Sequence, residues 1–200
     1  MRPGPDRQEL AGPAGPEPTT REPVELRVGE LLLRPWREDD AEAVWAAAQD
    51  PVMRQWHGVE SRTLDGARAR LARLADWSTG DHCSWAVQDA GVLVGSVSLH
   101  ELDHDQAEGE AGYWTVAAAR GRGIAVRAAD AVCRWGFATL GLDRVQLFHA
   151  VENVASGRVA AKAGFTLEGR LRRSHRYPDG VKHDELLWSR LADDPPPALG

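Results

Sequence analysis

The sequence predicts one α/β domain built on a mixed sheet, and three observations predict it. The 200 residues are 42% hydrophobic and 27% charged, which is enough apolar material to bury a single core. The hydrophobic pattern changes repeatedly between the helical period and the extended one. Turn-forming residues separate the segments, whose expected order is β, α, α, β, β, β, α, β, α, β, β.

The two ends of the chain are expected to lie outside this domain. Residues 1–26 are rich in Pro, Gly, Glu and Thr and contain hardly any large apolar side chain. Burial therefore cannot offset the entropy lost on ordering them. The stretch DDPPPALG, 193–200, has the same character. We expect a disordered leader over 1–26, a domain over 27–192 and a disordered tail over 193–200.

The first part of the domain contains one strand and two helices. The stretch LLLRPW (31–36) predicts the first strand, and EDDAEAVWAAAQD (38–50) predicts a helix. The acidic residues that open this helix suit the positive end of its dipole. Thr63 is a candidate cap for the second helix. Its apolar residues recur on one face: Leu64, Ala67, Leu71 and Leu74.

Three extended segments and a long helix follow. CSWAVQ (83–88) and VLVGSVSL (92–99) flank the turn-prone linker 89–91, which is typical of an antiparallel hairpin. EAGYWTV (110–116) is the third segment. The helix then runs to about Leu140 and ends at Gly141, in the usual C-terminal cap position. A further strand, a short helix ending at Gly164 and a hairpin around 178–180 complete the pattern: 144–150, 154–164, 166–177 and 182–191.

Charge and composition exclude several classes of protein. The net charge of -6 argues against nucleic-acid binding, which normally needs a basic face, and favours cationic partners such as amines. No apolar run approaches the roughly 18 residues of a membrane span, and the N-terminus lacks the apolar core of a signal peptide. We therefore expect a cytoplasmic protein without membrane contact. Cys83 and Cys133 suit neither a disulfide framework nor a metal site, and are expected to be small buried hydrophobes.

Two glycines, Gly121 and Gly123, open the long helix between arginines. A helix N-terminus has unpaired N–H groups and partial positive charge, and glycine lets an anion approach the backbone. This arrangement predicts a phosphate cradle. A P-loop is excluded because G-x-x-x-x-G-K-[ST] does not occur. A dinucleotide fold fits poorly, because Val126 stands where a third Gly or Ala belongs and hairpins precede the loop.

The stretch RGRGIA (120–125) matches the Arg/Gln-x-x-Gly-x-Gly/Ala signature of the GCN5-related N-acetyltransferases, the GNAT superfamily. The resemblance extends over about residues 27–191, through LRPWREDDAEAVWAAAQDP, GYWTV and RVQLFHAVENVASGRVAAKAGFTLEGRLR. In this order the motifs resemble the branch that includes the ribosomal-protein N-terminal acetyltransferases (RimJ/RimL-like). One departure is Arg127, where that branch often has Glu. The resemblance implies a mostly antiparallel sheet, splayed between the fourth and fifth strands.

The resemblance also implies how acetyl-CoA binds as a co-substrate, with no metal involved. The pantetheine arm would lie in the splay like an added strand, and backbone amides of the loop would hold the pyrophosphate. The residues expected beside the arm are Trp114, Thr115 and Val116. The residues expected at the pyrophosphate are Arg120, Gly121, Arg122, Gly123, Ile124 and Ala125. Asn153 and Ser156 are expected to contact the arm or loop, although Asn and Ser are also ordinary helix caps.

The reaction requires a neutral amine and a proton for the departing thiolate. Glu110 and Glu101 are the candidate bases, with Glu110 favoured because the family commonly has an acid there; a solvated strand-end charge is the alternative for each. The resemblance implies that Ser156 is the candidate proton donor and that Tyr177 is a fallback acid. His149 is a further candidate, or else a packed strand histidine. Tryptophans in the region that the superfamily uses for specificity line a pocket or simply pack the core: Trp36, Trp45 and Trp56.

The predicted function is direct transfer of an acetyl group from acetyl-CoA to a primary amine. The α-amine of a protein or peptide is preferred as the substrate, because its pKa of about 8 needs less help than the 10.4 or so of lysine. A small-molecule amine such as an antibiotic, polyamine or amino acid is the alternative. A non-catalytic acyl-CoA sensor is a further alternative, motivated by Arg127. A homodimer is possible, because dimers are common in this branch.

Overall fold

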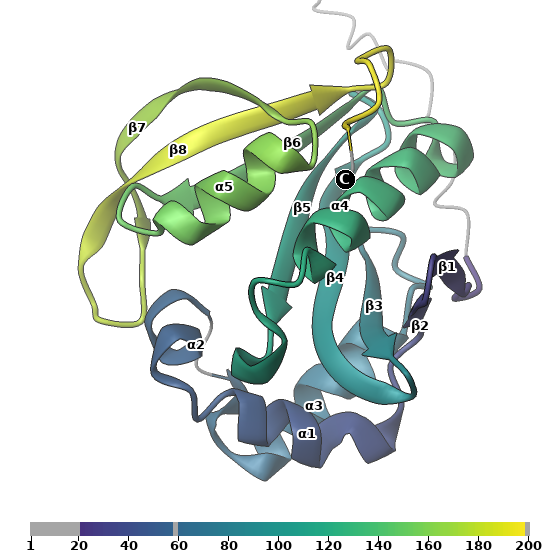
Figure 1. Cartoon of the computed structure of the whole chain (residues 1–200), viewed down its shortest axis with the longest axis vertical. Helices are drawn as coiled ribbons and strands as arrows, with labels where there is room; N and C mark the ends of the chain where they lie inside the picture. Colours follow the sequence, from purple (N-terminus) through teal and green to yellow (C-terminus); the bar gives the residue numbers. More distant parts are fainter. Residues whose placement is uncertain (1–20, 58–59, 199–200) are drawn as a thin grey trace, which may run out of the picture.

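The computed structural model describes residues 21–57 and 60–198. Within them, helices lie on both faces of an eight-stranded sheet of order β1-β2-β3-β4-β5-β6-β8-β7 (Figure 1). The strands are β1 Leu26–Val28, β2 Leu31–Arg34, β3 Cys83–Asp89, β4 Val92–Asp103, β5 Glu108–Thr115, β6 Arg144–Ala150, β7 Thr166–Arg176 and β8 Lys182–Leu191. The helices are α1 Ala41–Ala47, α2 Pro51–Trp56, α3 Leu64–Ala75, α4 Ile124–Trp135 and α5 Val154–Lys162. This architecture confirms the predicted mixed α/β class.

The sheet splits between β5 and β6, the only parallel pair in the described part of the chain. Their pairing runs from Glu108 to Glu110 on β5, whereas β5 stays paired with β4 as far as Thr115. The two strands therefore diverge after Glu110. This confirms the splay expected between the fourth and fifth predicted strands, which are β5 and β6 because the prediction omits β1.

The main core lies between the sheet and α4. The indole of Trp85 meets those of Trp77 and Trp135 at centroid distances of 4.7 and 5.1 Å. Cys83 and Cys133 are free and buried in this core, and burial raises the pKa of each thiol to about 12. Both cysteines therefore behave as small buried hydrophobes, as predicted.

The opposite face of the sheet is covered by α1 and α3, which pack around Trp36, Leu71 and Ala86. The Thr63 hydroxyl accepts a hydrogen bond from the main-chain N–H of Gly66 at 3.0 Å, so the predicted cap of α3 is confirmed. In Figure 1, α4 and α5 lie in front of the sheet, whereas α1 and α2 lie near its lower end.

The helix predicted over 38–50 is shorter in the structure, because α1 ends at Ala47 and a separate helix, α2, follows. The carboxylate of Asp50 caps α2 and accepts hydrogen bonds from the main-chain N–H groups two and three residues on, at 3.0 and 3.1 Å. Pro51 occupies the first helical position. An Asp–Pro pair is a strong helix start, and it begins a second helix directly after the predicted one.

Several other predicted boundaries are confirmed. The strands predicted over 144–150 and 182–191 have those limits. After α4, a π-helical turn over Gly136–Leu140 leads to Gly141, whose φ of 70° provides the predicted C-terminal cap. These segments were identifiable because periodicity and turn residues specify them locally.

The ends of the domain differ slightly from the prediction. Strand β1 begins at Leu26, and just before it the Val24 carbonyl accepts a hydrogen bond from Trp85 Nε1 at 2.8 Å. The expected disorder of 1–20 and of 199–200 lies outside the described residues. Across 21–57 and 60–198, none of the helices is long and apolar enough to cross a membrane.

Candidate active site

A cavity of about 640 Å³ opens where β5 and β6 diverge. Strand β5, strand β6, the loop before α4 and the first turn of α5 form most of its wall, and α2 and the β7–β8 turn close one side. Because pairing with β6 ends at Glu110, the edge of β5 beyond that residue has main-chain groups without a neighbouring strand. The cavity therefore offers an exposed strand edge to an extended ligand.

The glycine loop forms one end of the cavity. Gly121 and Gly123 have φ angles of 77° and 71°, which only glycine adopts without strain. A Cβ built at either position meets nothing within 4 Å, so the backbone surface is open there. Ile124 is buried and anchors the start of α4, while Ala125 also lines the cavity. The N-terminal amides of this 12-residue helix suit an anion.

The two arginines of the loop are held by carboxylates from distant elements. Arg120 Nη2 lies 2.7 Å from Asp50 Oδ1, and Arg120 Nε donates to the Thr115 carbonyl at 3.2 Å. The hydrogen bond from Arg120 to Asp50 is the main reason that the pKa of Asp50 is lowered. Arg122 pairs with Asp89 at the end of β3. Both guanidinium groups therefore brace the loop. Of these two arginines, Arg120 lines the cavity and Arg122 does not.

The three residues expected beside the pantetheine arm separate into two groups. Trp114 and Thr115 line the cavity. The main-chain N–H of Val116 instead donates to the Val94 carbonyl at 2.9 Å, and its carbonyl accepts from Ala119 N at 2.9 Å. The expectation that Val116 offers free main-chain partners is therefore corrected, because the turn after β5 uses both groups.

A pair of hydroxyl groups bridges the gap between β5 and α5. Tyr113 Oη lies 2.8 Å from Ser156 Oγ and 3.1 Å from the Ser156 carbonyl oxygen. Burial raises the pKa of Tyr113 to about 12, so the phenol keeps its proton at neutral pH. Asn153 caps α5 by accepting a hydrogen bond from Ser156 N at 3.2 Å. All three residues line the cavity, and the contact of Tyr113 with Ser156 was missed because they are distant in sequence.

The structure separates the two candidate bases. Glu110 lines the cavity at the last paired position of β5. Burial, followed by the charges of Glu185 and Glu101, raises the pKa of Glu110 to about 7. His100 Nε2 lies 3.9 Å from Glu110 Oε1, and burial lowers the pKa of His100. Glu101 is exposed and lines a separate cavity of about 340 Å³.

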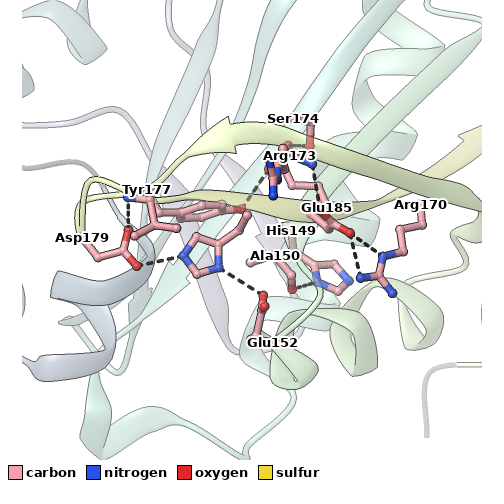
Figure 2. Close-up of polar contacts among 12 residues, drawn as sticks. His149, Ala150, Glu152, Arg170, Arg173, Ser174, Tyr177, Asp179 and Glu185 are labelled. Carbon is pink, nitrogen blue, oxygen red and sulfur yellow. Dashed lines mark hydrogen bonds and ion pairs between the residues drawn. The ribbon is translucent and has the colours of Figure 1, made fainter.

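His149 lies at the cavity but uses both ring nitrogens within the protein. Its Nδ1 lies 2.8 Å from the carbonyl oxygen of Ala150 (Figure 2), and its Nε2 accepts a hydrogen bond from Trp188 Nε1 at 3.0 Å. Both ring nitrogens are therefore engaged by partners within the protein. The side chain is buried. This arrangement matches the packed strand histidine, the alternative considered for this residue.

The remaining wall joins α2 to the β7–β8 turn. Trp56 contacts Tyr177 edge-on, with ring centroids 5.5 Å apart, and both side chains line the cavity. Tyr177 Oη donates a hydrogen bond to Glu185 Oε1 at 2.9 Å (Figure 2). His57 ends this wall, and burial lowers its pKa to about 4. Glu185 was missed by sequence reasoning, because nothing in the local pattern marks a strand glutamate as buried.

Comparison with known proteins agrees with this geometry. The sequence model described as "Acetyltransferase (GNAT) domain" matches residues 30–166. The uncharacterized N-acetyltransferase YoaA of Bacillus subtilis (strain 168) is 27% identical over 168 residues, covering 82% of this chain and 94% of that protein. The ribosomal-protein-serine acetyltransferase of Escherichia coli (strain K12) is 30% identical over 101 residues, covering 50% of this chain and 56% of that protein.

The fold has a similar solved structure. Mycobacterium smegmatis RimJ in complex with CoA-disulfide superimposes with a TM-score of 0.76 and 26% identity, over 88% of this chain and 89% of that one. The family match covers most of the domain, including the strand edge, the glycine loop and the start of α5. The chain therefore belongs to the GNAT acetyltransferase family and is an acetyl-CoA-dependent N-acetyltransferase.

Proposed function

We propose that this protein acetylates the N-terminal α-amine of a protein or peptide. One observation carries the proposal: Glu110, with a pKa of about 7, lies in the cavity at the point where β5 and β6 diverge. The pKa of Glu110 is close to that of an α-amine, which is about 8, and far below that of a lysine amine, which is about 10.4. Glu110 therefore accepts a proton from an α-amine more readily than from lysine. The similarity to a ribosomal-protein-serine acetyltransferase supports a protein as the acceptor.

Two ends of the cavity hold the donor in this proposal. Main-chain amides of the loop bind the pyrophosphate, and the edge of β5 that lacks a neighbouring strand beyond Glu110 binds the amides of the pantetheine arm, beside Trp114 and Thr115. Arg120 and Arg122 shape the loop through their carboxylate partners and add positive charge near it. Asn153 fixes the first turn of α5. The loop residues are Gly121, Gly123, Ile124 and Ala125, all of which line the cavity.

In this proposal the proton transfers from the amine and to the thiolate take place on different sides of the cavity. The amine side consists of Glu110, Trp56 and Tyr177, and the thiol side consists of Tyr113 and Ser156. The substrate ammonium first passes one proton to Glu110, which releases it to water. As the neutral nitrogen then bonds to the acetyl carbon and the carbon–sulfur bond breaks, Glu110 accepts the second proton that the nitrogen loses. Ser156 donates a proton to the departing sulfur, supported by the hydrogen bond to Tyr113. Ser156 regains a proton from water after the products leave.

The proposal is tested by thiol release from acetyl-CoA with a panel of amines. The panel contains short peptides with different free N-termini, the same peptides already N-acetylated, and lysine, polyamines and aminoglycosides. Release that depends on peptides with a free N-terminus is the expected result. Release with a small amine alone overturns the α-amine assignment and moves the substrate to that class.

A further inference from the structure

Tyr177 stands where the cavity meets the β7–β8 turn, and its hydrogen bond has a fixed direction. The ring is 9% exposed, and its edge contacts with Trp56 and His183, at 5.5 and 5.4 Å, hold it in place. The phenol donates to Glu185 Oε1 at 2.9 Å (Figure 2). Burial first, and then the hydrogen bond to Glu185, raises the pKa of Tyr177, so the proton stays on the phenol.

Glu185 is a buried carboxylate whose two oxygens are both engaged. Its second oxygen, Oε2, accepts a hydrogen bond from Ser174 Oγ at 2.8 Å (Figure 2), and the residue is only 8% exposed. Both donors are neutral hydroxyl groups. The negative charge of Glu185 therefore adds to that of Glu110 on this wall. After burial, it is the largest cause of the raised pKa of Glu110.

The hydrogen bond to Glu185 decides what Tyr177 offers to a ligand. A phenol has one hydroxyl proton, and here Tyr177 donates it in the hydrogen bond to Glu185. Toward the cavity, Tyr177 therefore presents only oxygen lone pairs. Glu110, once ionised, is likewise able only to accept hydrogen bonds. An ammonium group has only donors, and it carries a positive charge. Tyr177 and ionised Glu110 therefore match a charged amine, and neither offers a donor to an amide oxygen.

We propose that Glu185 is a positioning residue that turns Tyr177 into a hydrogen-bond acceptor for the ammonium group of the substrate. Together the pair selects the charged amine over the neutral amide that acetylation produces. The inference rests on the proposed function, because it assigns the amine to this side of the cavity. Acetylation removes both the charge and two N–H donors from the nitrogen, so the product loses these contacts and leaves.

The test compares the binding of one peptide in its free and N-acetylated forms to the full chain saturated with CoA. Calorimetry gives the two dissociation constants, and their ratio measures recognition of the ammonium group without any turnover. We expect the free peptide to bind the wild type more tightly, and Glu185→Gln to reduce the ratio about tenfold, because a hydrogen bond assisted by charge is lost. Tyr177→Phe keeps the ring and should reduce the ratio in the same way, so a folding defect in one variant leaves the other informative.

Glu152→Gln is the matched control. The Glu152 side chain is 58% exposed, lies outside the residues that line the cavity and contacts His183 at 3.4 Å, so its substitution should leave the ratio unchanged. An unchanged ratio in both Glu185→Gln and Tyr177→Phe overturns the inference, even if peptides are acetylated. If the amine panel shows that only a small amine is acetylated, the proposed function fails, and the same comparison with that amine and its acetyl derivative still decides the role of Glu185.

Discussion

The chain has two tyrosines, and both line the cavity from opposite sides. Tyr113 on β5 contacts a hydroxyl, that of Ser156, whereas Tyr177 in the β7–β8 turn donates its proton to a carboxylate, that of Glu185. The pKa of each is raised mainly by burial, so both phenols stay protonated at neutral pH. The partner, and not the ionisation state, therefore decides whether a phenol supports proton donation or presents lone pairs.

The largest effect is expected for the base on the amine side. Glu110→Gln should lower kcat by about 100-fold or more, because general-base catalysis is lost. The wild-type rate should rise with pH through about 7, the pKa of Glu110, and this acidic limb should vanish in the variant. Steady-state rates from pH 5.5 to 9 provide the measurement. Glu101→Gln is the matched control, since Glu101 lies outside the cavity, and an equal loss in that variant would refute the assignment.

Smaller effects are expected for the two tyrosines, on kcat for Tyr113 and on KM for Tyr177. Ser156→Ala should lower kcat about tenfold to 100-fold, and Tyr113→Phe about tenfold, since both weaken proton donation to the thiolate. Because the two hydroxyls act as one unit, the double variant should be no slower than Ser156→Ala alone. Tyr177→Phe should instead raise the KM for the amine. Additive losses in the double variant would show that Tyr113 and Ser156 act independently.

Glu110→Gln should stabilise the fold although it lowers kcat. The pKa of Glu110 is raised from its usual value to about 7, so the folded state holds this proton more tightly than the unfolded chain. Ionising the buried carboxyl therefore costs the folded state free energy, which grows from about pH 4.5 to 7 and then stays constant. Glu110→Gln should raise the unfolding free energy by about 1 to 3 kcal/mol above pH 7 and by nothing near pH 4. Thermal unfolding at both pH values checks this, and equal stabilisation at both would contradict it.

The smallest effect concerns the glycine loop alone. Gly123→Ala and Gly141→Ala both place alanine at a φ near 70°, with no atom within 4 Å of the new Cβ. Each should cost about 1 kcal/mol of stability from backbone strain. Gly123→Ala should also weaken acetyl-CoA binding, whereas Gly141→Ala should not, because Gly141 only caps the helical run at its far end. Equal acetyl-CoA affinity in the two variants would place the pyrophosphate elsewhere.

The sequence predicted those parts of the molecule that local pattern determines. Strand β6 and the glycine loop follow from periodicity and turn chemistry, and the splay followed from the family resemblance. Helix α2 was missed because its start at Asp50 looked like the end of the preceding helix. The main-chain pairing of Val116 depends on a turn that the pattern does not reveal.

Side-chain contacts across the cavity were beyond sequence reasoning. Tyr113 and Ser156 are 43 positions apart, and they meet only because β5 and α5 face each other across the splay. Tyr177 and Glu185 are closer, 8 positions apart, but the direction of their hydrogen bond depends on how the β7–β8 turn folds. The family resemblance offered Tyr177 as a fallback acid, whereas its hydrogen bond to Glu185 supports the acceptor role that we propose.

One peptide that carries both a free N-terminus and an internal lysine tests the central claim most directly. The peptide is incubated with the enzyme and labelled acetyl-CoA at pH 7.5, and fragmentation mass spectrometry locates the label. Acetylation of the α-amine with the lysine unmodified is the predicted result, because Glu110 suits an amine with a pKa of about 8. Label on the lysine, or an unlabelled peptide together with an acetylated small amine, would contradict it.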